Sequence, residues 1–214
     1  TASDVTFQGF NLSVSSLGDT SATNYADAAI AVSNGGASIA GVTITGNTIT
    51  GGGDKGNNGS GIGVLLDNVD PGTRGGQPVG VTVRGNTITN FNFTGIAGTN
   101  GTNTTKQTTT LGTDFQGGIA NNVVTGTAPG VTTTQQNGIS FSGGSFGDIT
   151  TNTIKSIASF NANAASNAAG IVVGEFFGQA SGGLITINGN TVTNAQVGVL
   201  VTGRDGVAMT TVQG

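Results

Sequence analysis

The nine residues VTITGNTIT, at positions 42–50, return almost unchanged as VTVRGNTITN at 81–90 and as ITINGNTVTN at 185–194. More divergent copies read VTFQGFNLS at 5–13, GGIANNVVT at 117–125 and GDITTNTIK at 147–155. All six fit one template of apolar, any, apolar, any, Gly or small, Asn, any, apolar and Thr. Successive copies are spaced 30 to 39 residues apart, so the chain is built from an internal repeat.

A second apolar patch follows each copy of the template. These patches are AIAV at 29–32, GIGV at 61–64, GIAG at 95–98, GISF at 138–141, GIVV at 170–173 and GVLV at 198–201. In both kinds of patch the apolar residues recur with a period of two, which predicts β-strands, and no segment has a persuasive helical period. We therefore expect each repeat to contain two strands, joined by turns of Gly, Asn and Asp.

The repeats favour a coil that stacks each strand on its own counterpart over a propeller, because blades need four strands and usually carry aromatic signatures. Stacking predicts chemically uniform columns, and the alignment has them. One inward column is Phe7, Ile44, Val83, Ile119, Ile149 and Ile187. A second column is Phe10, Asn47, Asn86, Asn122, Asn152 and Asn190. Stacked amides bond to one another at the strand spacing of about 4.8 Å, so the second column predicts an asparagine ladder at a corner between strands.

With this template, VTITGNTITGG…GSGIGV resembles the parallel β-helix repeat of pectin-lyase-like proteins, and the resemblance covers the whole chain. It implies an all-β fold, a right-handed parallel β-helix (β-solenoid) of about six coils in one domain, residues 1–214. The longest linkers are expected to protrude as loops, at 51–60, 67–78, 99–118 and 126–137. The last segment, GRDGVAMTTVQG, is expected to start a seventh rung, and the chain to be processed or a fragment of a longer protein.

The amino-acid composition argues against some classes of binding partner. The chain has 40 Gly, 7% charged residues and a net charge of −4. Its six Lys and Arg are scattered and form no phosphate-binding stripe, which argues against nucleic acid. No apolar run reaches the roughly eighteen residues of a membrane span, so no membrane insertion is expected. The absence of Cys excludes disulfides and thiolate metal sites, and the abundance of Thr, Asn and Gly is typical of large exported bacterial proteins. A secreted or cell-surface location is expected.

The resemblance also implies three kinds of catalytic site on acidic polysaccharides: paired Asp, an acidic Ca²⁺ cluster with an Arg or Lys base, or a Tyr, His and Asp set. The chain has no His and a single Tyr, which excludes the last. The best acidic pair is Glu175 with Asp205, beside Arg204, expected on adjacent rungs. A second group, Asp67, Asp70 and Arg74, would either bind Ca²⁺ or hold a loop by an ion pair, and the loop interpretation is favoured. No residue is assigned a catalytic or cofactor role.

Threonine recurs at the outward positions of the template. Three columns are Thr43, Thr82 and Thr186; Thr48, Thr87, Thr153 and Thr191; and Thr50, Thr89, Thr125 and Thr193. Gly118, Asp148, Val123 and Lys155 interrupt them. Such a lattice is suited to ice or a sugar surface, although Thr is also favoured on exposed strand faces. Glycosylation sequons begin at Asn11, Asn58, Asn92, Asn100 and Asn103, mostly in predicted loops.

Three functions remain open on this sequence. The favoured one is a non-enzymatic module of an adhesin, fibre or passenger domain that binds glycan or protein through the loops between coils, or that self-associates end to end. The alternative is a lyase-like enzyme acting on uronic-acid polymers, and the third is an ice- or surface-binding solenoid. The chain is expected to fold as one unit, and its function to lie in the segments that are not repeated.

Overall fold

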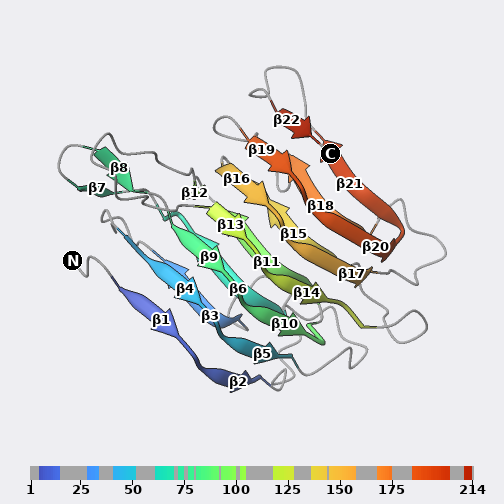
Figure 1. The fold of residues 1–214 in the computed structure, drawn as a ribbon, viewed down its shortest axis with the longest axis horizontal. Coiled ribbons are helices and arrows are strands. Elements are labelled where there is room, and N and C mark those ends of the chain that lie inside the picture. Colours follow the sequence, from blue (N-terminus) through green and yellow to red (C-terminus); the bar gives the residue numbers. More distant parts are fainter. Residues whose placement is uncertain are drawn as a thin grey trace.

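Strands account for every regular element that the structure describes. The structure is a computed structural model, and it describes residues 5–14, 28–33, 41–51, 61–69, 72–74, 77–79, 81–91, 93–99, 102–104, 118–127, 136–143, 145–157, 168–174, 185–202 and 210–213. The strands form three parallel sheets, here named A, B and C, which the chain visits in turn (Figure 1). Within these residues no helix is long and apolar enough to cross a membrane.

Each coil takes one strand from each sheet. Sheet A contains β1 (Thr6–Gln8), β4 (Thr43–Thr45), β9 (Thr82–Arg84), β13 (Gly118–Ala120), β16 (Phe146–Thr150), β19 (Ile185–Asn188) and β22 (Thr210–Gln213). Sheet B contains β2 (Asn11–Ser13), β5 (Thr48–Thr50), β10 (Thr87–Thr89), β14 (Val123–Thr125), β17 (Thr153–Ile157) and β20 (Thr191–Ala195). Sheet C contains β3 (Ala28–Ser33), β6 (Ile62–Asp67), β11 (Thr94–Thr99), β15 (Asn137–Phe141), β18 (Ala169–Gly174) and β21 (Val197–Thr202). The fold is thus a parallel β-helix of six complete coils, and β22 begins a seventh layer on β19, as predicted.

Two further elements lie outside this plan. The strands β7 (Gly72–Arg74) and β8 (Gln77–Val79) form an antiparallel hairpin between sheets C and A, inside the predicted loop 67–78. The short strand β12 (Asn103–Thr104) lies inside the predicted loop 99–118 and pairs with the start of β16. The sequence analysis missed both, because neither follows the template.

The register of sheets A and B confirms the predicted columns residue by residue. In sheet A the pairing runs from Phe7 to Ile44, Val83, Ile119, Ile149 and Ile187. In sheet B the last apolar position of the template, the one before Thr, runs from Leu12 to Ile49, Ile88, Val124, Ile154 and Val192. In the second coil, for example, Val42, Ile44 and Ile49 are buried and Thr48 is exposed.

Sheet C corrects one alignment. Ile96 pairs with Val64, so the second coil matches GIAG at 95–98 with GVLL at 63–66, two residues after the patch GIGV chosen from the sequence. The error arose because that stretch carries two glycines two residues apart, Gly61 and Gly63, and a period of two cannot separate them. The remaining coils align as expected, with Ile96, Ile139, Ile171 and Val199 in one column.

The glycine of each sheet C patch has a steric reason. A Cβ on Gly138 would lie 2.5 Å from Gly170 O and 2.5 Å from Ile154 Cγ2 in the next coil. Gly63, Gly95 and Gly170 meet the equivalent atoms of their own next coil at similarly short distances. Sheet C therefore packs its glycines directly on the apolar column of sheet B, and a side chain there requires the coils to move apart.

Candidate functional site

The corner between sheets A and B is the same in all six coils. The residue before the ladder position has positive φ in every coil: Gly9, Gly46, Gly85, Asn121, Thr151 and Gly189. The ladder follows at once. Asn47 Nδ2 donates to Asn86 Oδ1 at 2.9 Å, and this bond repeats from Asn86 to Asn122, Asn152 and Asn190 at 2.9 to 3.0 Å. The predicted asparagine ladder is therefore present, and it begins where Phe10 N donates to Asn47 Oδ1.

Each interior ladder amide makes at least four hydrogen bonds. Asn122 Oδ1 accepts from the backbone N and from Nδ2 of Asn86, while Asn122 Nδ2 donates to Asn152 Oδ1 and to Val83 O. The side chain is completely buried. Because every polar atom of this buried amide is paired, the A–B corner is a rigid line along the solenoid.

The other two corners differ from coil to coil. Between sheets B and C the connection ranges from the single residue Gln196 to residues 14–27, and between sheets C and A it ranges from 142–145 to 100–117. The connections thus differ in length only at the two corners that flank sheet C, the B–C and C–A corners, and not at the ladder. The A–B corner is constant and the other two corners are variable.

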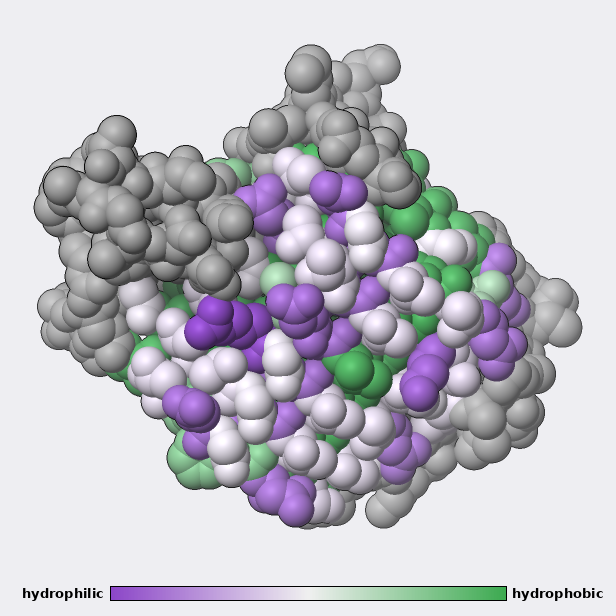
Figure 2. All heavy atoms as spheres, viewed as in Figure 1, coloured by the Kyte–Doolittle hydropathy of each residue, from purple (hydrophilic) through white to green (hydrophobic). Residues whose placement is uncertain are grey.

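Sheets A and B together present one broad outward face, which Figure 2 shows in mostly pale and purple, weakly to strongly hydrophilic colours. The three predicted Thr columns lie on it in register, at Thr43–Thr82, Thr48–Thr87–Val123–Thr153–Thr191 and Thr50–Thr89–Thr125–Lys155–Thr193. Thr45 and Thr150 lie on a further outward column of sheet A that the sequence analysis missed, although the alternation signalled it. One expectation was wrong: Thr82 is buried and does not face water.

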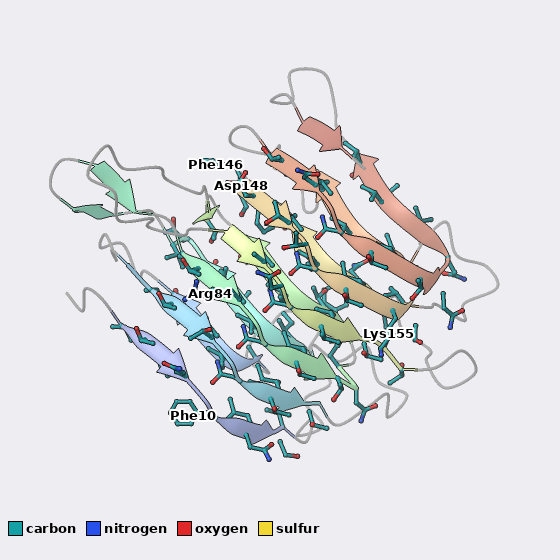
Figure 3. The ribbon with its side chains drawn as sticks, viewed as in Figure 1. Phe10, Arg84, Phe146, Asp148 and Lys155 are labelled. Atoms are coloured by element: carbon teal, nitrogen blue, oxygen red, sulfur yellow. The ribbon has the colours of Figure 1, made fainter. Side chains whose placement is uncertain are left out.

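Charged side chains on this face are few. Within the described residues they are Arg84 on β9, Asp148 on β16 and Lys155 on β17, and Figure 3 shows Lys155, in sheet B, well apart from the other two, in sheet A. Gly118 and Ala120, on the strand between β9 and β16, bring almost no side-chain volume. No group of three or more His, Cys, Asp or Glu in the described part of the chain is placed to hold a metal ion.

Asp67 is hydrogen-bonded to side chains of the two neighbouring coils. Its carboxylate accepts from Thr99 Oγ1 at 3.1 Å and from Ser33 Oγ at 3.4 Å, and both hydroxyls belong to register partners in sheet C. The side chain therefore joins three adjacent coils. Arg74 ends β7 of the hairpin, and Asp70 lies outside the described residues. The proposed grouping of Asp67, Asp70 and Arg74 stays a prediction.

Glu175, Arg204 and Asp205 also lie outside the described residues. The strands that precede them are neighbours, since Gly174 of β18 pairs with Thr202 of β21. The two acids thus follow adjacent rungs, and their approach to each other stays a prediction. Of the sequons, Asn11 is exposed in β2, within the first copy of the predicted strand template, and Asn103 lies in β12, inside the predicted loop 99–118. Asn58, Asn92 and Asn100 are outside the described residues.

No protein family, curated protein or solved structure matches this chain.

Proposed function

We propose that this chain is a non-enzymatic, extracellular structural and adhesive module, a right-handed β-helix of the pectin-lyase-like class that holds loops of unequal length against a glycan or a protein surface. The observation that supports it is the contrast between corners. The A–B corner repeats without insertion and carries the asparagine ladder, while the B–C and C–A corners differ in length from coil to coil. A rigid support lowers the entropy that a binding loop loses on contact.

The segment 105–117 is the best place to test the loops. Thr104 pairs with Gly147, and Ile119 pairs with Ile149, so Gly118 lies opposite Asp148. Thr104 and Gly118 therefore occupy consecutive positions along β16. Deleting residues 105–117 therefore joins Thr104 directly to Gly118 without a change of register along β16.

The experiment compares the full chain with this deletion on arrays of defined glycans and on immobilised extracellular-matrix proteins. If the loops carry adhesion, the deletion weakens binding at least about tenfold, the loss of about 1.4 kcal/mol, while far-UV circular dichroism and the melting temperature stay unchanged. Undiminished binding in this and in the matching deletion of 128–135 argues against the loops. Release of unsaturated products from uronic-acid polymers, with or without Ca²⁺, supports the lyase instead.

A second candidate function, binding to ice or another ordered surface, is favoured by the outward face of sheet B. Thr48, Thr87, Thr153 and Thr191 are exposed and lie in register along the solenoid axis, in a column with about the strand spacing of 4.8 Å in which Val123 takes the third position. Inhibition of ice recrystallisation measures this activity. Thr87→Lys interrupts the array and abolishes it, while Thr202→Lys, at an exposed position at the end of β21 in sheet C, is the control. No inhibition by the unmodified chain excludes this candidate.

A further inference from the structure

The chain contains five Asn-Gly pairs, the sequence in which the following backbone nitrogen most readily attacks the Asn side chain because glycine offers no steric hindrance. Asn34, Asn58 and Asn100 begin pairs outside the described residues. The other two pairs, Asn137–Gly138 and Asn188–Gly189, lie in strands of different coils, and the structure places them in opposite environments.

Asn137–Gly138 is enclosed. Asn137 is 2% exposed, its backbone N donates to Phe93 O at 2.8 Å, and its Oδ1 accepts from Ala169 N at 3.5 Å. Gly138 lies against Gly170 O and Ile154, with no room for even a methyl group. The Asn137 side chain reaches the Gly138 nitrogen only when coils four and five separate.

Asn188–Gly189 is open. Asn188 is exposed at the end of β19, and Gly189 turns the corner with φ of +63°. At the other five corners the backbone N of the corner residue donates to a carbonyl of the next coil at 3.0 to 3.3 Å. The corresponding carbonyl at Gly189 belongs to Gln213 of β22, the register partner of Asn188. Asn188 and Gly189 are nevertheless exposed, in contrast to the buried Asn137.

We propose that Asn188–Gly189 is a site of spontaneous succinimide formation, and that its product loosens the sixth coil. Gly189 N attacks Cγ of Asn188, a C–N bond forms, and ammonia leaves with the proton from Gly189. Water then opens the ring at either carbonyl, which yields aspartate or isoaspartate. The net change replaces the amide by a carboxyl group, without any oxidation or reduction.

The isoaspartyl product perturbs the end of the ladder. Asn188 O accepts from Thr151 N at 3.0 Å and from Asn190 Nδ2 at 3.2 Å, and Asn190 Oδ1 accepts from Asn152 Nδ2 at 2.9 Å. An isoaspartyl linkage adds one methylene to the backbone between residues 188 and 189. This addition displaces Asn190 from its position above Asn152, so the reaction removes the last rung of the ladder.

Peptide mapping by mass spectrometry tests the proposal on the folded full chain, held at mildly alkaline pH and compared with the same chain in denaturing urea. Strand residues in the interior react only through rare opening. In the folded chain, Asn188 is therefore expected to convert at least about a hundredfold faster than Asn137, and in urea the two rates converge. Equal rates in the folded chain, or an unreacted Asn188 after the unfolded chain has converted, overturn the proposal.

A matched variant separates the consequence from general ageing. Asn188→Gln keeps the amide but forms the six-membered ring far more slowly. Aged unmodified chain is expected to lose hydrogen-exchange protection in β20 and β21, whereas the aged variant keeps it. Equal loss of protection in both chains shows that the reaction at Asn188 does not loosen the sixth coil.

Discussion

Truncation of one interior ladder amide is the sharpest test of what holds the coils together. Asn122→Ala removes a completely buried side chain from the middle of the solenoid. Two acceptor contacts, from Asn86 N at 3.0 Å and Asn86 Nδ2 at 2.9 Å, and two donor contacts, to Asn152 Oδ1 at 3.0 Å and Val83 O at 2.9 Å, disappear together. The backbone and the neighbouring apolar columns are unchanged.

The magnitude follows from which partners are left unpaired. Asn86 Nδ2 still donates to Ile44 O, and Asn152 Oδ1 still accepts from Asn122 N. Asn86 N, in contrast, loses the one acceptor that it has among the described residues, in a buried corner, which costs about 1 to 3 kcal/mol. Each of the other three lost bonds contributes about 1 kcal/mol. The expected loss in the free energy of unfolding is about 4 to 6 kcal/mol, a fall in melting temperature of about 8 to 24 °C for a chain of this size.

Urea unfolding followed by far-UV circular dichroism measures this loss, and Asn190→Ala is the matched control. Asn190 has the same chemistry, but it is the last described member of the ladder and is partly exposed. Water therefore reaches the groups that truncation leaves behind, and the control loses about 1 to 2 kcal/mol. If Asn122→Ala costs no more than Asn190→Ala, or less than about 1 kcal/mol, the ladder is not a major source of stability.

Three further predictions concern the packing and the corners. Gly138→Ala destabilises the chain by about 1 to 3 kcal/mol, since its Cβ meets Gly170 O at 2.5 Å, whereas Gly198→Ala, with nothing within 4 Å, stays within about 1 kcal/mol in the same urea assay. Thr151→Asn raises the melting temperature, because Thr151 has φ of +56°, which a β-branched residue adopts at a cost of about 1 to 2 kcal/mol. A melting temperature that is unchanged or lower shows that the backbone of Thr151 is not strained. Phe10→Asn extends the ladder to the first coil, next to Asn47, and removes an aromatic ring that is half-exposed. The variant is therefore expected to self-associate less at high concentration in analytical sedimentation. Unchanged self-association shows that Phe10 does not lie in the contact between copies.

The repeat was readable because each coil faces the same physical problem. A stacked strand must place an apolar residue inward at every second position, and a buried corner must satisfy its backbone, so Ile44 and Asn47 recur in kind along the chain. Periodicity therefore predicted the parallel β-helix, its columns and its ladder. It failed in sheet C, where Gly61 and Gly63 satisfy the same period and only packing against Ile88 selects Gly63.

The candidate site was less predictable for the opposite reason. Residues that do not repeat obey no shared constraint. The sequence therefore did not reveal that β12 and β13 pair with successive parts of β16, that Asp67 bonds to two neighbouring coils, or that Thr82 is buried. The sequence by itself determined which residues stack, because stacking is a local and repeated demand on side-chain chemistry. The tertiary structure alone decided which glycine is in register and which Asn-Gly pair is open, because these depend on atoms of the next coil, some thirty or more residues away.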